Sequence, residues 1–460
     1  MKAWKYTRKL TDEAIPVLLT EEEQTWTESN KIEEANDFLL SLEWDSCVPG
    51  SGAPESVIVG AVQSLENMGY DVEELEELLP LGLEANRNKD YQTLNSLTAK
   101  LKKKMREVKI IADHPYWKTK VYETFEEYAS KVQFPEKINL DLDGDSFSNK
   151  ILAGWYSRLC GGALGTEIEG FTTKQLENKF GKISGYLRKP NTYNDDITYE
   201  IAFLESCIKA KGKPDSEKIA EQWVALVPSG WSAEKIALDN IAHGIFPPES
   251  GFDNNPYREW IGAQMRGAVC GQVSPGNPYL AAELAWMDGC VSHHGNGILG
   301  EVFNSILVSF CFVEKDLKKV LEKTIALIPS ETEYGMVVRN ALKECEKSNF
   351  KEVWKICEKK YEEYNWIHTY PNAAAEVVSL YFCNGDFQTL MENIAYCGQD
   401  ADCNAAQIAV AIASMNGMKG IDDKWIQPFG SKIQTYIRGM KEIEIQELVL
   451  KTIDIAKMLK

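Results

Sequence analysis

The sequence lacks a hydrophobic run long enough to cross a membrane. Its longest apolar stretch, residues 305–313, is about half as long as the roughly 20 residues that a membrane helix needs. The N-terminus begins with basic residues, but Asp12 and Glu13 interrupt it before the short apolar run at 15–19. A signal peptide needs a longer apolar segment. We therefore expect a protein that neither spans a membrane nor carries a secretory signal.

The sequence contains fewer basic than acidic residues. The 460 residues include 50 Lys and Arg against 69 Asp and Glu, which gives a formal net charge of −19. Such a chain repels the phosphate backbone of nucleic acids and the surface of anionic lipids. The sequence also has no GxxxxGK[ST], and no GxGxxG follows a strand. P-loop phosphoryl transfer, Rossmann-type hydride transfer and nucleic-acid binding are therefore without support.

The eleven cysteines form no CxxC pair and show no regular spacing. They lie mostly on apolar, helix-like stretches between Cys47 and Cys403. An odd number in this pattern is typical of buried, reduced thiols and not of a disulfide framework. We therefore expect a cytoplasmic protein.

Helical periodicity dominates what the sequence does contain. A composition that is 44% hydrophobic and 26% charged is that of a folded globular chain, and this length suggests two or three domains. Strand signals are scarce, a polar passage at 135–149 divides the chain, and VPGSGAP at 48–54 indicates a loop. We predict an all-α protein with a smaller helical N-terminal extension of unknown role (1–145) and a large helical core (149–460). Helices are expected at 29–42, 54–68, 94–108, 121–132, 151–165, 196–210, 217–227, 233–242, 278–289, 297–312, 340–348, 371–382 and 404–415.

Two acidic motifs stand at predicted helix starts. Asn194, Asp195 and Asp196 begin one helix, and Asp400 and Asp402 lie in a turn before an Ala-rich helix. Each acid has an ordinary explanation as a helix cap that the helix dipole stabilises. The alternative is that the four carboxylates converge on hard divalent cations such as Mg²⁺, which take oxygen ligands. Spacing along the chain leaves both interpretations open.

A Gly-rich helix precedes another acidic residue. Gly154, Gly161 and Gly165 are seven and four residues apart, which places them on one face and lets another helix approach closely. Glu169 follows on a tight turn, where a glutamate suits acid–base chemistry if its pKa is raised. A solvated surface glutamate is the commoner outcome. The sequence does not decide between these two roles.

The polar, Gly-rich turn at 291–297 contains two adjacent histidines, His293 and His294. A zinc site would need further His or Cys ligands at local spacing, and the turn offers none. It is either a loop that contacts substrate or an exposed turn.

Five segments, in order, resemble the ADP-ribosylglycohydrolase family, whose founding activity is that of dinitrogenase reductase-activating glycohydrolase. They are AGWYSRLCGGALGTEIEG at 153–170, NDDITYEIAFLES at 194–206, the stretch at 255–303, HTYPNAAAEVV at 368–378 and CGQDADCNAA at 397–406. Together they cover roughly residues 149–418, and five ordered motifs are far more specific than any one of them. Residues 1–145 lie outside the resemblance.

The resemblance implies a helical core with a central cleft that holds two Mg²⁺ ions, or in some members Mn²⁺. The residues that match the metal ligands are Asn194, Asp195, Asp196, Asp400, Asp402 and Cys403. Glu169 matches a glutamate near the scissile bond, and the matches to the substrate-side motifs are His293, Asn296, Gly297, Asn372 and Gly398. The implied activity is hydrolysis of an ADP-ribosyl, or related ribosyl, N- or O-glycoside. Its substrate would be an ADP-ribosylated protein or a small ADP-ribosyl compound.

Two departures from the family pattern keep other hypotheses open. Cys403 stands where the family has Ser or Thr, and Ala268 stands where many relatives have an acid. Sulfur is a poor partner for Mg²⁺, so either one metal site is weakened, or it prefers a softer ion, or Cys403 does not ligate. The alternative function is a non-catalytic protein that binds ADP-ribose or a nucleotide. In a third hypothesis, residues 1–145 dock a partner or cover the cleft.

Overall fold

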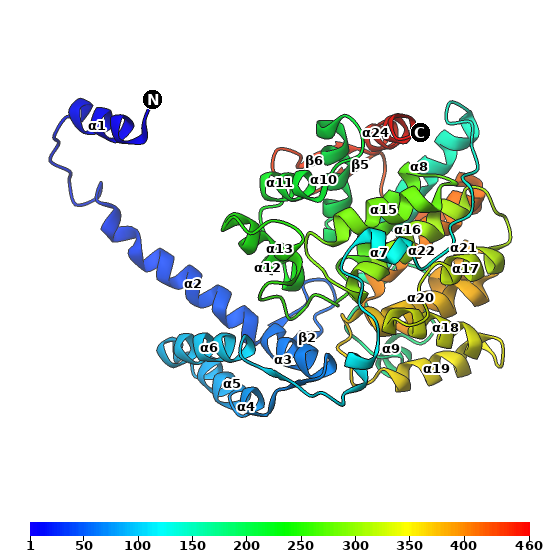
Figure 1. The fold of residues 1–460 in the computed structure, drawn as a ribbon, viewed down its shortest axis with the longest axis horizontal. Helices are drawn as coiled ribbons and strands as arrows, with labels where there is room; N and C mark the ends of the chain where they lie inside the picture. Colours follow the sequence, from blue (N-terminus) through cyan, green and yellow to red (C-terminus); the bar gives the residue numbers. More distant parts are fainter.

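The computed structural model describes residues 1–460, apart from the side chains of Trp26 and Thr27, and it is built of helices (Figure 1). The described strands contain two or three residues each and form three antiparallel pairs. These are β1 Ser46–Cys47 with β2 Pro54–Glu55, β3 Tyr70–Asp71 with β4 Lys109–Ile110, and β5 Lys432–Gln434 with β6 Glu442–Glu444. The prediction of an all-α protein is confirmed.

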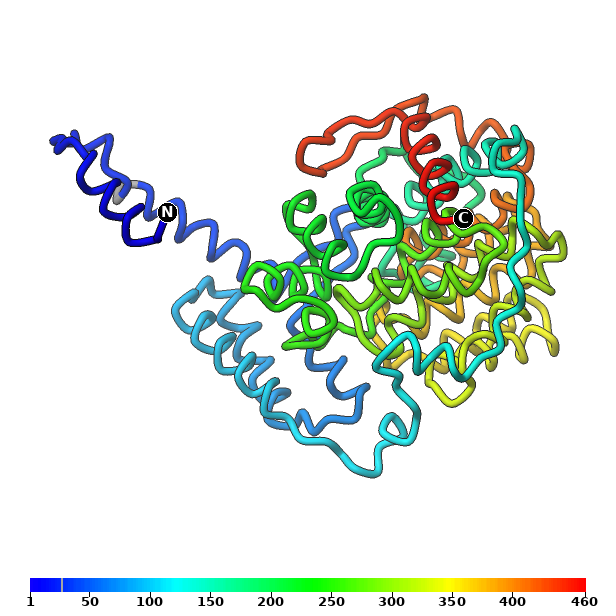
Figure 2. Tube along the Cα trace, turned by 45° about the horizontal axis from the view of Figure 1, so that its top comes forward, coloured from blue at the N-terminus to red at the C-terminus, as the bar shows by residue number. Residues whose placement is uncertain are grey.

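The chain begins with an arm that extends away from the rest of the molecule in both views (Figures 1 and 2). It consists of α1 Ala3–Glu13, the 3-10 helix η1 Thr25–Glu28 and α2 Ser29–Trp44. Helix α1 has no buried residue, and α2 buries only Trp44. The arm therefore joins the body at the C-terminal end of α2.

Trp44 is the centre of a small apolar cluster that we call the small core. Its indole ring is fully buried, and its Nε1 donates a hydrogen bond of 2.8 Å to Oγ1 of Thr98. A Cβ at Gly82 would overlap this ring, so the glycine allows the close approach. The helices around the small core are α3 Val57–Asn67, α4 Glu73–Glu76, α5 Leu79–Arg87, α6 Tyr91–Met105 and the 3-10 helix η2 Pro115–Lys118.

A much larger apolar cluster, the large core, takes in the rest of the chain from α7 onward and also includes Val57 and Ala61 of α3. Its helices are α7 Phe125–Ala129, α8 Asp145–Gly165, α9 Thr173–Phe180, α10 Asp195–Ala210, α11 Ser216–Leu226, α12 Ser232–Ala242, α13 Glu249–Phe252, η3 Gln264–Arg266, α14 Gly267–Val273, α15 Pro278–Gly289, α16 Asn296–Cys311, α17 Leu317–Ala326, α18 Glu333–Cys345, α19 Phe350–Lys360, α20 Thr369–Cys383, α21 Phe387–Cys397, α22 Ala401–Asn416, η4 Met418–Gly420, α23 Asp423–Ile426 and α24 Ile445–Met458. Helices α16, α20 and α22 lie deepest, since nearly all of their residues are buried.

Helices α8 and α22 pack closely against each other. A Cβ at Gly161 would overlap the backbone of Ala405, and one at Gly165 would overlap the backbone of Asp402. The expectation that this glycine face admits another helix is confirmed. The approach brings the end of α8 to the first turn of α22.

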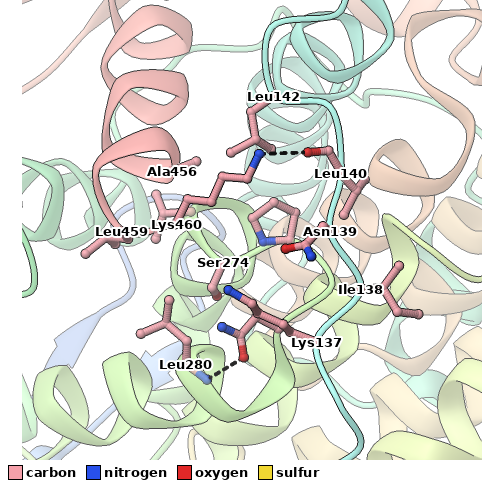
Figure 3. Close-up of a pocket in the computed structure, with 13 residues that line it drawn as sticks. Lys137, Ile138, Asn139, Leu140, Leu142, Ser274, Leu280, Ala456, Leu459 and Lys460 are labelled. Atoms are coloured by element: carbon pink, nitrogen blue, oxygen red, sulfur yellow. Dashed lines mark hydrogen bonds between the residues drawn. The ribbon is translucent and has the colours of Figure 1, made fainter.

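The polar passage between the small core and α8 is an ordered strap. Ile138 N donates to the carbonyl oxygen of Gly276 at 2.9 Å. Nζ of Lys460 in the C-terminal tail donates to the carbonyl oxygen of Leu140 at 3.3 Å, as Figure 3 shows. The strap covers a cavity of only about 40 Å³. This volume has room for a few water molecules.

Most predicted helices are present, and in some of them a capping side chain sets a start different from the predicted one. The helix predicted at 54–68 begins at Val57, because Ser56 caps it and residues 54–55 form β2. The helix predicted at 340–348 begins earlier, at Glu333, behind the cap Thr332. Among the described residues, no helix is both long and apolar enough to span a membrane.

Candidate metal centre and active site

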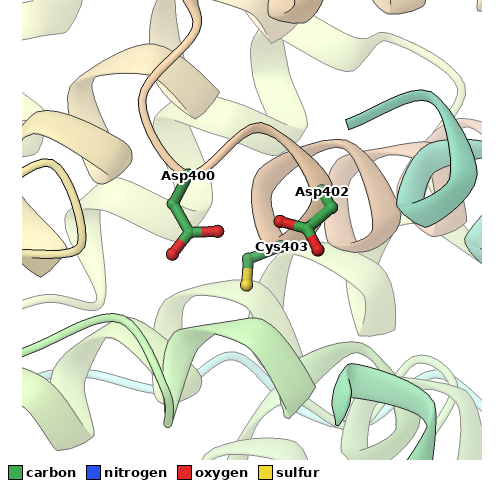
Figure 4. A group of neighbouring side chains, drawn as sticks. All are labelled: Asp400, Asp402 and Cys403. Carbon is green, nitrogen blue, oxygen red and sulfur yellow. The ribbon is translucent and has the colours of Figure 1, made fainter. Parts of the chain in front are cut away.

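Two helix N-termini bring the acidic motifs together. Asp195 and Asp196 lie in the first turn of α10, while Asp400 directly precedes α22 and Asp402 lies in its first turn. Figure 4 shows the side chains of Asp400, Asp402 and Cys403 at the start of α22, and their ligand atoms all lie within 4.8 Å of one another. The structure thus gathers a group of three residues able to hold a metal ion.

Contacts across the site join α10 to α22. Sγ of Cys403 lies 3.3 Å from Oδ1 of Asp196, and Nδ2 of Asn194 donates to Oδ2 of Asp402 at 3.3 Å. Oγ1 of Thr166, just after α8, lies 3.5 Å from the same Asp402 oxygen. Five of the six predicted metal ligands are named in these contacts or in the α22 group, and the sixth, Asp195, adjoins Asp196.

The carboxyl groups are close enough to perturb one another. Burial, followed by the charge of Asp402, raises the pKa of Asp196 and of Asp400 well above the ordinary value. Asp195 keeps an exposed surface, yet the protein packed around its carboxyl group and the charge of Asp402 raise its pKa to about 6. Unless a cation or protons offset their charge, the mutual repulsion of these carboxylates raises the free energy of the folded state.

The residues present fit a divalent cation. Four buried oxygen atoms at the site have no hydrogen-bond partner among the described residues, namely Asn194 Oδ1, Asp196 Oδ2, Asp400 Oδ1 and Asp402 Oδ1. Buried polar atoms are rarely left unpaired in folded proteins, and carboxylate and amide oxygens are ligands that Mg²⁺ and Mn²⁺ accept. Burial also raises the pKa of the Cys403 thiol well above its ordinary value, which keeps the sulfur protonated. Cys403 is placed as a donor to Asp196.

Glu169 reaches the same site from the turn after α8. Backbone hydrogen bonds tie this turn to the Asp400 loop: Gly170 N donates to Gln399 O at 2.8 Å, and Gln399 N donates to Phe171 O at 3.1 Å. Gly398 and Gln399 both have positive φ, at 65° and 60°, which favours glycine at the first of them. Burial, followed by the charges of Asp402 and Asp400, raises the pKa of Glu169 well above its ordinary value.

Asn372 forms hydrogen bonds with the loop that contains Asp400. Its Oδ1 accepts hydrogen bonds from the backbone N of Asp400 at 3.1 Å and from Nδ2 of Asn404 at 2.7 Å. Its Nδ2 donates to the carbonyl oxygens of Trp366 and His368, both at 2.8 Å. The predicted residues Asn372 and Gly398 therefore lie beside the carboxylates and shape their loop.

The turn at 291–297 lies in a different set of contacts. His293 is fully buried, with Nδ1 2.7 Å from Ser292 Oγ and Nε2 3.9 Å from Glu234 Oε1, and burial lowers its pKa well below the ordinary value. Asn296 Nδ2 donates to Glu259 Oε1 at 2.9 Å, and its Oδ1 accepts from Tyr334 N at 3.1 Å. A Cβ at Gly297 would overlap the backbone of Arg258. These contacts connect the three residues to Glu234, Glu259, Tyr334 and the backbone of Arg258, and their contact with substrate stays a prediction.

The loop between β1 and β2 was not foreseen as part of this region. A Cβ at Gly50 would overlap Thr166 and lie 3.1 Å from Oε1 of Glu169, and Nη2 of Arg188 donates to the carbonyl oxygen of Gly50 at 3.1 Å. The sequence offered only a Gly- and Pro-rich loop at this place. Its packing partner is more than a hundred residues away, and no local signal indicates it.

Three comparisons relate the chain to known proteins. The sequence profile described as ADP-ribosylglycohydrolase matches residues 143–452. A protein of Archaeoglobus fulgidus, described as an uncharacterized protein, is 24% identical over 312 residues, which are 63% of this chain and 92% of that protein. A solved structure titled "ADP-ribosylglycohydrolase-related protein complex" superposes with a TM-score of 0.51 at 16% identity, over 69% of this chain and 100% of that one. At this identity the structural likeness shows the fold alone.

Proposed function

The chain belongs to the ADP-ribosylglycohydrolase family, and on this premise we propose that it is a divalent-metal-dependent hydrolase of an ADP-ribosyl, or related ribosyl, N- or O-glycoside. The product is ADP-ribose or a similar sugar. Residues 149–460 form the catalytic domain, and residues 1–145 form an N-terminal extension to it.

The observation that carries this proposal is the group of unpaired oxygens between α10 and α22. Asn194, Asp195, Asp196, Asp400 and Asp402 would hold two cations, Mg²⁺ or Mn²⁺, while Cys403 orients Asp196 by its hydrogen bond. A bound divalent cation supplies Lewis acidity and binds vicinal sugar hydroxyls through hard oxygen contacts. A ribose diol is the substrate group that suits this donor set.

The chain's own carboxyl groups then assist bond cleavage. Glycoside hydrolysis builds positive charge on the sugar ring, which nearby carboxylates stabilise. Glu169 lies beside Asp402 on a turn fixed to the Asp400 loop, and its raised pKa suits a group that exchanges a proton with water or with the departing atom. We assign Glu169 the acid–base role.

A second candidate function is binding without cleavage. Cys403 replaces the family's hydroxyl residue, and the predicted ligands Asp400 and Asp402 are only 4% and 5% exposed. If the protein binds the two metal ions weakly, it would still bind the ribosyl group but would no longer cleave the glycosidic bond. Binding of ADP-ribose without release of product would support this second function.

Calorimetric titration of ADP-ribose into the metal-stripped protein, with and without Mg²⁺, tests both. We expect binding that needs Mg²⁺ and that is lost in Asp400→Asn. The matched control is Asp316→Asn, which changes an acid at the remote N-cap of α17 and should bind as the wild type does. Release of free ADP-ribose from an ADP-ribosylated substrate would then distinguish a hydrolase from a binding protein. ADP-ribose binding that depends neither on Mg²⁺ nor on Asp400 would contradict the proposed site.

The cellular setting follows from the thiols. All eleven cysteines are free, and all but Cys47 are buried. Free thiols suit a reducing compartment, so we place the protein in the cytoplasm. Its partners there are an ADP-ribosylated protein or a small ADP-ribosyl compound, and the excess of acidic residues argues against nucleic acid.

A further inference from the structure

A loop from outside the family-matched residues packs on the turn that carries Glu169. Strands β1 and β2 and the loop between them, residues 46–55, form what we call the N-terminal hairpin. Val48 N donates to Ala53 O at 2.9 Å and Gly52 N donates to Val48 O at 2.8 Å, so the loop is closed on itself. Ala53 is fully buried. The hairpin is therefore a compact element that its own backbone hydrogen bonds stabilise.

The inner side of the hairpin lies against the turn at 166–170. A Cβ at Gly50 would overlap Cγ2 and the carbonyl oxygen of Thr166 and would lie 3.1 Å from Oε1 of Glu169. A Cβ at Gly170 would lie only 2.6 Å from that of Ala53. The two backbones therefore touch, and a larger group cannot pass between them.

Side chains clamp the hairpin in this position. Arg188 donates to Gly50 O at 3.1 Å and forms an ion pair of 3.1 Å with Glu167, which belongs to the same turn. On the far side, both carboxylate oxygens of Glu55 accept from Nε1 of Trp231 at 3.1 Å. Just beyond the hairpin, Tyr257 donates from its hydroxyl to Val57 O at 2.9 Å. The hairpin is thus fixed to the large core from both ends.

The hairpin bounds the space beside Glu169, where the group that leaves the sugar has to sit. The acidic residues behind it are buried, and Asp195 is the one carboxylate of the four with an exposed surface in this structure. The hairpin occupies the position beside Glu169, so a folded protein that carried its modified side chain there would have to displace it. The exposed side of the carboxylate group is at Asp195, away from this contact in the sequence, and it is the side left to a small molecule.

We propose that the N-terminal hairpin is a specificity determinant that restricts the leaving group to a small molecule and excludes ADP-ribose attached to a folded protein. The inference rests on the proposed hydrolase function and narrows its substrate class. Within the hairpin, Gly50 lies beside Glu169. Arg188 is the positioning residue, because it donates a hydrogen bond to the carbonyl oxygen of Gly50.

The test compares two probes that carry the same linkage, free ADP-ribosyl-arginine and an arginine-ADP-ribosylated protein, together with the corresponding serine-linked pair. For the linkage that is cleaved, we expect the wild type to favour the small probe at least tenfold in kcat/KM. Gly50→Ala forces the hairpin off the turn and should lower this preference at least threefold. Arg188→Ala removes a half-exposed side chain and should also lower the preference for the small probe. Unlike Gly50→Ala, it introduces no steric overlap in the protein interior.

Gly52→Asn is the matched control. Gly52 lies in the same loop with φ 74° and no atom within 4 Å of a built Cβ, and asparagine tolerates this conformation better than other residues with a Cβ. It should keep the wild-type preference, and circular dichroism with thermal melts checks that all variants fold. Equal kcat/KM for both probes in the wild type overturns the inference, as does an unchanged preference in folded Gly50→Ala and Arg188→Ala. If the wild type neither binds ADP-ribose with Mg²⁺ nor cleaves any probe, the proposed function itself falls and the inference falls with it.

Discussion

The thiol of Cys403 lies 3.3 Å from Oδ1 of Asp196, and this contact joins the first turns of α22 and α10. A hydroxyl at this position would be a harder atom and a better hydrogen-bond donor than sulfur. The contact explains how the chain keeps its carboxylate arrangement without the family's usual Ser or Thr.

Replacement of the thiol by a hydroxyl tests the role of Cys403. In Cys403→Ser we expect Mg²⁺ to bind severalfold more tightly in a calorimetric titration, because a hydroxyl orients Asp196 better and can itself accept a hard cation. Cys290→Ser, a similarly buried thiol at the end of α15, should leave the affinity unchanged. Loss of metal binding in Cys403→Ser alone would instead identify the sulfur as a ligand.

Asp402 is the neighbour whose charge raises the pKa of the other carboxyl groups. Asp402→Asn removes that repulsion and keeps an oxygen for Asn194 and Thr166. We expect the metal-free variant to be more stable than the wild type by on the order of 1 kcal/mol. Addition of Mg²⁺ should raise the melting temperature of the wild type but not that of the variant. A metal-free variant that melts below the wild type would contradict this account of the carboxylate cluster.

Glu169→Gln separates chemistry from binding. The amide keeps the shape of the side chain but cannot take up a proton as a carboxylate does. We expect kcat to fall by about 10²–10⁴-fold, while the Mg²⁺-dependent affinity for ADP-ribose changes less than threefold. Rapid-mixing product assays and calorimetry measure the two quantities. Full activity in the variant would remove Glu169 from the mechanism.

The pKa of Asp195, raised to about 6, predicts a pH dependence. A carboxyl group whose pKa is higher in the folded than in the unfolded chain contributes stability below its unfolded pKa, near 3.9, and loses this contribution as the pH rises through the folded value. The metal-free wild type should therefore lose melting temperature relative to Asp195→Asn as the pH rises from about 4 to about 6. Saturating Mg²⁺ favours the ionised carboxylate and should reverse the trend. Parallel melting curves for the two proteins would show that Asp195 titrates normally.

Tyr116 connects the small core to the large one. Its hydroxyl donates to Oε1 of the buried Glu259 at 3.0 Å. Tyr116→Phe leaves this carboxylate with one donor fewer, and we expect a loss of about 1–3 kcal/mol in the free energy of unfolding by urea. Tyr279→Phe, at an exposed ring, should cost less than 0.5 kcal/mol. An equal loss in both variants would mean that the Tyr116 hydroxyl adds nothing specific.

Much of the site could be predicted from the sequence because its acids stand at helix starts. The Asn194–Asp196 and Asp400–Asp402 motifs are each local, and the resemblance to the family predicted that they meet, while the Gly161 and Gly165 face predicted the close packing of α8 on α22. Glu169 follows the same helix along the chain. These residues needed only helix periodicity and the order of the family motifs.

Other features depended on packing between distant segments. The polar turn containing His293 could be a substrate loop or an exposed turn from the sequence, and packing with Ser292, Glu234 and the surrounding helices buries the His293 side chain. The contact of Gly50 with Thr166 joins two loops with no shared periodicity. Tertiary packing of this kind leaves no signal in local residue spacing.

The N-terminal hairpin has a consequence for how this chain diverges over time. Residues 46–55 wall off the Glu169 turn, whereas the carboxylates come from helices that begin after residue 190. A substitution in the hairpin acts on the turn that carries Glu169 and leaves the four aspartates of α10 and α22 in place, whereas a substitution in those aspartates leaves the hairpin in place. The hairpin that we propose to set selectivity and the acids that we propose to hold the metal ions are thus encoded by separate stretches of the sequence, and substitutions can change one without the other.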